Sequence, residues 1–267
     1  MLLKGLVAAV YGGGGAIGGA IARQFAREGA VVHLAGRTRE KLDSVAREIA
    51  RDGGMARSAL VDALDPAAVA QHACSVVSES GALDIVVNAV GLAHVQGKPL
   101  LELSLDEFMT PIQGYAAAQF AVGKAAAEHF VKQRSGVLVT LSTPGANRAY
   151  QGVLGFAMAC AAIECFTRQL ACELGAVGAR VVCLRPDFMP ETLERGSHAR
   201  AVFGAVAERL GLSLDELLTS TSAGQDALLK RPATLAELAH TAAFVASPGA
   251  GALTATTVNV SCGSVVG

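Results

Sequence analysis

The chain has 267 residues, of which 52% are hydrophobic and 17% are charged, and its formal net charge at pH 7 is −1. This composition is typical of a globular protein with a large core and excludes an intrinsically disordered one. The 22 basic residues are scattered along the chain, so the sequence predicts neither a nucleic-acid nor a membrane surface, and a small molecule is the expected partner.

Targeting segments are not expected from the amino-terminal sequence. Residues 1–15 contain one lysine and an apolar run that leads directly into a glycine cluster, which argues against a signal peptide. Elsewhere, apolar runs are interrupted before they reach membrane-spanning length. We therefore expect a cytoplasmic protein.

Short apolar runs alternate with longer helical patterns along the chain. The runs cover residues 5–11, 30–36, 82–90, 136–142, 179–186 and 254–260, and helices are expected from about Ile17 and from about Arg39. Such alternation predicts βαβ units, and strands that are apolar throughout are covered on both faces. We expect one α/β domain over residues 1–267, with a mainly parallel sheet of six or seven strands flanked by helices.

Capping signals mark several helix starts, as follows: Ser104 with Glu107, Ser213 with Glu216, Thr234 with Glu237, and Asp65 before Pro66. Residues 188–231 contain two short helical patterns between a strand and the last helix. Because this segment is longer than a simple crossover needs, we expect it to form a lid over a substrate.

A glycine cluster joins the first expected strand to the first expected helix. In this position glycines let the backbone approach a pyrophosphate, whose charge is met by the free N–H groups and the dipole of the helix. A flexible linker is the alternative interpretation. The candidate cofactor contacts here are Gly12, Gly14, Gly15, Ala16, Ile17 and Gly18.

The second expected strand ends at Gly36, where an acidic residue would bind a free ribose 2′-hydroxyl. Arg37 and Thr38 follow instead, and an arginine there can bind a 2′-phosphate with both arms of its guanidinium group. A solvated charge at the start of a helix is the alternative for Arg37 and Arg39. NADP(H) is therefore favoured over NAD(H).

The sequence resembles the short-chain dehydrogenase/reductase family from end to end. The glycine cluster is similar to the family's TGxxxGxG with Tyr11 for the threonine, residues 84–91 (DIVVNAVG) resemble its DxLVNNAG, and residues 231–263 resemble its closing helix and strand. The resemblance implies a Rossmann-type doubly wound fold. It also implies further cofactor contacts at Asp62, Asn88, Ala89, Gly91, Pro186 and Thr192.

The catalytic set of this family is Asn, Ser, Tyr and Lys. At three of these four positions, the resemblance places a residue of another type. The YxxxK motif falls on Phe156 and Cys160, the serine falls on Ser142 or Thr143, and the asparagine falls on Tyr115. Reduction of a carbonyl by hydride needs a proton on the oxygen, and a positioned acid contributes ~100- to 10,000-fold in rate. Phe156 has no such proton, and a neutral Cys160 thiol does not replace an ammonium group.

Other residues near this position are candidate acids. They are Tyr115, His94 just after the fourth expected strand, and Tyr150 before the catalytic helix. Each has an alternative role in packing or on the surface. Asp187 stands where the family has a glycine and is either a turn residue or a ligand contact.

Beyond Asp187, three apolar side chains are candidates for facing substrate or for packing in the core, namely Phe188, Met189 and Phe203. The six cysteines form no CxxC pair and have no zinc-ligand spacing, so we expect buried free thiols and no metal site. Helices over residues 116–130 and 152–173 are rich in small apolar residues on several faces. They predict a homodimer or homotetramer, as the resemblance also implies.

Three functions remain open from the sequence. The first is an NADP(H)-dependent oxidoreductase of a carbonyl or alcohol that uses a non-standard acid drawn from Ser142, Thr143, Tyr115 and His94. The second is a catalytically silent cofactor-binding member that acts as a sensor or a partner subunit. The third is an isomerase, dehydratase or cyclase on the same scaffold. The retained glycine cluster and expected lid favour an enzyme.

Overall fold

The computed structural model describes residues 1–195, 197–220 and 226–266. Seven strands form one parallel sheet in the order β3-β2-β1-β4-β5-β6-β7. In chain order they are β1 (Val7–Tyr11), β2 (Val31–Gly36), β3 (Met55–Leu60), β4 (Ile85–Asn88), β5 (Gly136–Leu141), β6 (Ala179–Pro186) and β7 (Thr256–Val260). The strand order reverses between β1 and β4, and ligands of such sheets bind at the carboxyl edge beside this reversal.

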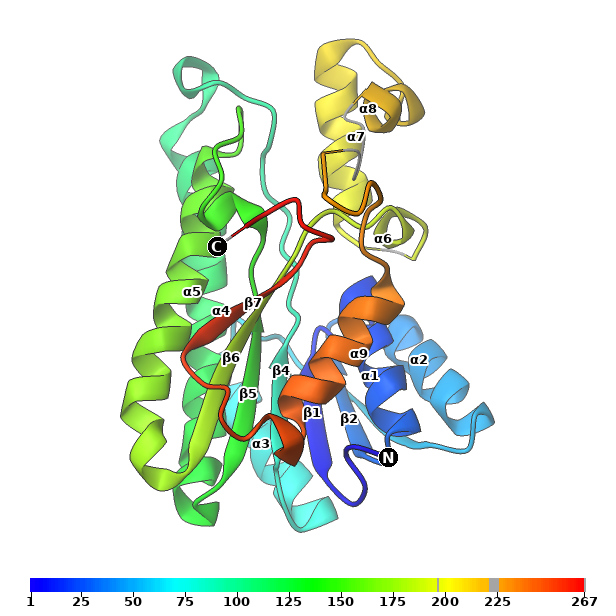
Figure 1. Cartoon of the computed structure of the whole chain (residues 1–267), viewed down its shortest axis with the longest axis vertical. Coiled ribbons are helices and arrows are strands. Elements are labelled where there is room, and N and C mark those ends of the chain that lie inside the picture. Colours follow the sequence, from blue (N-terminus) through cyan, green and yellow to red (C-terminus); the bar gives the residue numbers. More distant parts are fainter. Residues whose placement is uncertain (196, 221–225, 267) are drawn as a thin grey trace.

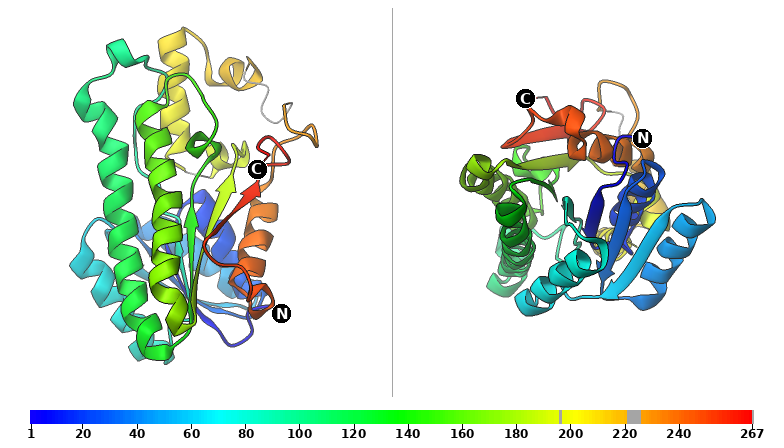
Figure 2. Two further views of the ribbon diagram at one scale, coloured as in Figure 1. Left: turned by 60° about the vertical axis from the view of Figure 1, so that its left-hand side comes forward. Right: turned by 90° about the horizontal axis from the view of Figure 1, so that it is seen from below.

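Helices cover both faces of the sheet (Figure 2). One face carries α1 (Ala16–Arg27), α2 (Arg39–Arg51) and α9 (Leu235–Ala246), and the other carries α3 (Pro66–Ser80), α4 (Leu105–Gln133) and α5 (Leu154–Leu174). Apolar side chains of the strands pack against each set of helices, so the sheet lies between two cores. The expected doubly wound α/β fold is confirmed, and the sheet is parallel throughout.

The segment after β6 lies above the carboxyl edge of the sheet (Figure 1). It contains α6 (Glu191–Glu194), α7 (Ala199–Leu210) and α8 (Leu214–Ser220). Residues 188–231 are the segment that was expected to form a lid over a substrate. Residues 196 and 221–225 of this segment lie outside the described chain. Its action as a lid stays a prediction.

Local capping chemistry follows the expected pattern. Ser104 with Glu107 and Thr234 with Glu237 form complete capping boxes at α4 and α9, and the Asp65 carboxylate accepts hydrogen bonds from the first turn of α3. The edge strand β3 was not among the expected runs, because its side chains are only partly buried or exposed and its sequence therefore carries no apolar run.

Cysteine burial differs from the expectation. All six thiols are free, but only Cys160 and Cys183 are buried, whereas Cys74, Cys165 and Cys172 are exposed on helices. These three positions lie on outward helix faces, which composition alone does not identify. Among the described helices, none combines the length and the apolar character that crossing a membrane requires.

The outer surface of α4 and α5 carries exposed apolar side chains, namely Phe120, Val131, Leu154 and Met158. These helices contain the segments 116–130 and 152–173 for which pairing between subunits is expected. The oligomeric state stays a prediction.

Candidate functional site

The glycine cluster forms a tight turn between β1 and α1. Gly12 has φ +78°, and a Cβ at this residue would lie 2.3 Å from the carbonyl oxygen of Ala89. A Cβ at Gly18 would lie 2.3 Å from the carbonyl oxygen of Gly12. The turn therefore needs glycine at both positions, and it directs the amino terminus of α1 toward the carboxyl edge of the sheet.

A cavity of about 340 Å³ opens beside this turn, within the usual size range of small-molecule sites. Its walls come from the loops after β1, β2, β3 and β4 and from the segment before α7. Predicted cofactor residues that line it are Gly12, Gly14, Gly15, Ala16, Ile17, Gly18, Arg37, Thr38, Asp62, Ala89 and Gly91. The four strands β1 to β4 thus bring together residues that lie far apart in the sequence.

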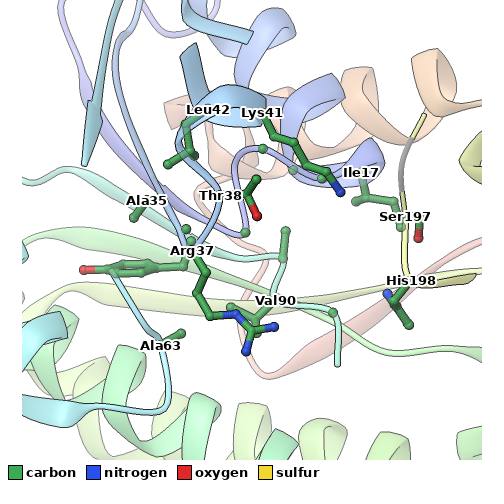
Figure 3. A pocket seen from close by; sticks show the side chains of 18 of the residues that line it. Ile17, Ala35, Arg37, Thr38, Lys41, Leu42, Ala63, Val90, Ser197 and His198 are labelled. Carbon is green, nitrogen blue, oxygen red and sulfur yellow. The ribbon is translucent and has the colours of Figure 1, made fainter. Parts of the chain in front are cut away.

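Two basic side chains extend into this cavity (Figure 3). Arg37 follows β2, and Lys41 lies one turn later in α2. Sequence reasoning missed Lys41, although a basic residue in the first turn of the helix expected after Arg37 was a usable signal. β2 ends at Gly36 and is followed by Arg37 and Thr38, so no carboxylate stands at the end of this strand. This end of the cavity therefore suits an anionic group.

Three other predicted cofactor residues do not line the cavity. The buried Asn88 amide donates to the carbonyl of Ala118 at 3.3 Å and accepts from the Val90 N–H. Thr192 donates its hydroxyl to the carbonyl of Met189 at 2.7 Å, and Pro186 ends β6 as a buried residue. The amide and the hydroxyl therefore serve the protein's own backbone in this structure.

The two candidate hydroxyl residues after β5 point to different surroundings. The Ser142 hydroxyl donates to Glu164 at 2.6 Å, and Glu164 in turn binds Arg185 at 2.6 and 2.7 Å. In contrast, the Thr143 hydroxyl lies 3.3 Å from the Cys160 thiol. Thr143 therefore contacts α5 at Cys160, whereas Ser142 contacts it one turn later, at Glu164.

The family resemblance places Cys160 at the position of a lysine, and a thiol cannot carry the positive charge of a lysine. Burial raises the pKa of its thiol to about 11, more strongly than the hydrogen bond with Thr143 lowers it. The thiol is therefore neutral at pH 7 and supplies no positive charge to a neighbour.

Tyr115 and His94 lie beside Phe156. The Tyr115 hydroxyl accepts a hydrogen bond from the Leu92 N–H at 3.2 Å, and burial raises the pKa of this phenol to about 12. The His94 ring stacks on Phe156 with centroids 4.1 Å apart and donates from Nδ1 to the carbonyl of Leu92. Burial lowers the pKa of His94, so this ring is neutral at pH 7.

His198 is a site residue that sequence reasoning missed. It lines the cavity together with Ser197 (Figure 3), and its ring centroid is 5.7 Å from that of His94. A Cβ placed on Gly91 would lie 2.4 Å from Nδ1 of His198. No local motif marks this histidine, because only the packing of the segment after β6 brings it to the β4 loop.

The remaining candidates have partners of their own. Tyr150 is exposed, and the Cζ atom of Arg148 lies over its ring, 5.2 Å from the ring centroid. The Asp187 carboxylate accepts from the Phe188 N–H at 2.7 Å and from the Ser264 hydroxyl, which agrees with a turn role. Met189 is buried, and the rings of Phe188 and Phe203 pack 4.9 Å apart.

Comparison with known proteins adds to this geometry. A family model described as Enoyl-(Acyl carrier protein) reductase matches residues 14–264. The short-chain reductase protein NovJ of Streptomyces niveus is 33% identical over 96% of this chain and 93% of its own length. The hydroxynaphthalene reductase arp2 of Aspergillus fumigatus is 31% identical over 93% of this chain and 88% of its own length.

Solved structures show the same architecture. A short chain dehydrogenase/reductase family protein has a TM-score of 0.78 at 28% identity and 98% coverage of both chains. An NAD⁺-bound xylitol dehydrogenase has a TM-score of 0.84 at 22% identity, with coverage of 98% of this chain and 100% of that chain. The second likeness bears on the fold alone.

Proposed function

The chain belongs to the short-chain dehydrogenase/reductase family, and from this premise we propose that it binds NADP(H) but has lost the acid for carbonyl reduction. The chemistry of this family is oxidoreduction of small molecules, and the curated relatives include a 3-oxoacyl-[acyl-carrier-protein] reductase and a gluconate 5-dehydrogenase. In this proposal the chain is a catalytically silent, cofactor-binding member that acts as a sensor or as a partner subunit.

The cavity beside α1 supports binding of the adenosine half of the cofactor. The glycine turn and the amino terminus of α1 provide N–H groups for a pyrophosphate, and Asp62 lines the wall where the family binds adenine. Arg37 and Lys41 supply positive charge for a 2′-phosphate. When bound, NADP(H) would supply or accept a hydride.

The surroundings of Phe156 carry the second part of the proposal. Burial raises the pKa of Tyr115 to about 12 and the pKa of Cys160 to about 11, and it lowers the pKa of His198 to about 4. Each shift moves the group away from the range in which it exchanges protons at neutral pH. The described residues around Phe156 therefore include no acid tuned for this reaction.

One observation favours a second function, an oxidoreductase with a displaced acid. The Tyr115 hydroxyl accepts from Leu92 and so keeps its own proton for donation, and its ring lies 5.9 Å from that of Phe156. In this alternative Tyr115 protonates the substrate oxygen and Thr143 assists. The raised pKa makes such an acid weaker than an ordinary tyrosine.

A titration with NADPH followed by fluorescence, joined to a turnover screen on ketones and alcohols, tests the proposal. We expect saturable binding of NADPH without turnover above the rate of a protein-free control. Absence of binding by NADPH and NADH would refute the proposed function. Turnover that disappears in a Tyr115→Phe variant would establish the displaced-acid alternative instead.

Arg37→Ala is expected to weaken NADPH binding by about 10- to 100-fold, because hydrogen bonds to charged groups contribute about 1.5–3 kcal/mol. NADH, which has no 2′-phosphate, should bind with little change. Arg39→Ala is the matched control, since Arg39 is exposed and points to Ser58. Isothermal titration calorimetry on the three proteins measures this effect. Equal losses of affinity for NADPH and for NADH would show that Arg37 does not bind the 2′-phosphate.

A further inference from the structure

The cavity beside the glycine turn is bounded by loops from one half of the carboxyl edge of the sheet. Its described lining residues come from the loops after β1 to β4, the first turns of α1 and α2, and Ser197 with His198. Thr143, Phe156 and Cys160, which flank the nicotinamide end in the family resemblance, are not among them. The lining of this cavity thus reaches Gly91 and Leu92 at the end nearest α5.

His198 closes the cavity at this end. Because a Cβ on Gly91 would lie 2.4 Å from Nδ1 of His198, the imidazole ring rests directly on the Gly91 backbone. A ligand group could not pass between them without displacement of the ring.

Three aromatic rings extend this closure toward α5. The ring centroid of His94 lies 5.7 Å from that of His198. The His94 ring also stacks on Phe156, with the centroids 4.1 Å apart and an angle of 12° between the ring planes. The position of His94 is held by bonds of 2.8 Å to the Leu92 carbonyl and to the Gln96 amide. We call His198, His94 and Phe156 the ring column.

The ring column has no internal charge repulsion at neutral pH. Burial lowers the pKa values of both His94 and His198, so both rings are uncharged and pack as apolar groups. Behind the column, the ring centroid of Tyr115 lies 5.9 Å from that of Phe156. The Thr143 hydroxyl lies 3.3 Å from the Cys160 thiol. The His94 ring thus covers the face of Phe156, at which the family resemblance places the nicotinamide.

We propose that this site binds the 2′-phosphoadenosine diphosphate half of NADP(H) and leaves the nicotinamide half outside the ring column. NADP⁺, NADPH and 2′-phospho-ADP-ribose should therefore bind with similar affinity. This inference rests on the proposed function and specifies its ligand. The recognised class is a 2′-phosphorylated adenosine diphosphate, whatever its distal group. A member of this kind responds to the total pool of the cofactor and not to its redox state.

Calorimetric titration with NADP⁺, NADPH and 2′-phospho-ADP-ribose tests the inference on the full chain. We expect dissociation constants that agree within about threefold, because the shared half makes the contacts. A dissociation constant for NADP⁺ or NADPH that is about thirtyfold or more below that of 2′-phospho-ADP-ribose would overturn the inference and leave the proposed function standing. If none of the three binds, the proposed function itself fails.

Variants of the ring column provide a second readout. His198→Ala opens the space above Gly91 and should make NADPH bind about tenfold more tightly than 2′-phospho-ADP-ribose, with His198→Asn behaving similarly. His240→Ala is the matched control, because His240 is exposed on α9 and its ring binds the carbonyl of Ala236 in the same helix. Equal unfolding curves establish that each variant is folded. An unchanged ligand ratio in both folded His198 variants would contradict the role of the ring column.

Discussion

A variant that combines Phe156→Tyr and Cys160→Lys with His198→Ala is expected to reduce a reference ketone with NADPH ~100- to 10,000-fold faster than His198→Ala alone. The new phenol would carry the proton that the substrate oxygen needs. The new ammonium group, one helical turn away, would lower the pKa of that phenol and favour its ionisation. Thr143 already stands beside position 160, with its hydroxyl 3.3 Å from the thiol.

Steady-state consumption of NADPH, measured on several ketones, gives this rate. Phe156→Tyr with His198→Ala, but without the lysine, is the control. Its phenol would lie in the same buried surroundings that raise the pKa of Tyr115, so we expect a much smaller gain. If the triple variant binds NADPH and stays at the background rate, the proposed loss of the acid is contradicted as the feature that limits reduction.

Arg185→Met is expected to lower the free energy of unfolding by about 3–5 kcal/mol, because it leaves the buried Glu164 carboxylate without its charged partner. Glu164 and Arg185 are only 8% and 7% exposed and are joined by two hydrogen bonds. Their network also holds the Ser142 hydroxyl and the Asn259 side chain. It lies at the carboxyl ends of β5 and β6, next to the ring column but not in it.

Denaturant unfolding followed by circular dichroism measures this loss. The exposed pair Arg57–Glu79 provides the control, since Arg57→Met should cost less than about 1 kcal/mol. A double variant, Glu164→Gln with Arg185→Met, should recover a large part of the stability because no unpaired charge is left. A cost for Arg185→Met no greater than that for Arg57→Met would contradict the importance of this buried pair.

Much of the fold follows from short-range patterns. Six of the seven strands coincide with apolar runs of the sequence, and the capping boxes at Ser104 and Thr234 form as expected. These features depend on neighbouring residues, whose hydrogen bonds and burial are set within a few positions. The edge strand β3 escaped detection because an edge strand that is half exposed lacks an apolar run.

The part of the candidate site that the sequence predicted is the cavity beside the glycine turn. The glycine turn and Arg37 line the cavity as the spacing indicated. Lys41 was missed, and the thiols of Cys74, Cys165 and Cys172 proved exposed, because the outward or inward direction of a helix face depends on its packing partner.

The sequence by itself determined the alternation of apolar strands with helices and the glycine turn, because each is a property of contiguous residues. The placement of Phe156 and Cys160 at the family's tyrosine and lysine positions stays a prediction from the resemblance. Only the tertiary structure decided that Thr143 faces Cys160 while Ser142 joins the Glu164–Arg185 pair, and that His198 rests on Gly91. These contacts join segments that are distant in the chain, and their geometry depends on how the loops at the carboxyl edge pack together. No local pattern of residues encodes that packing.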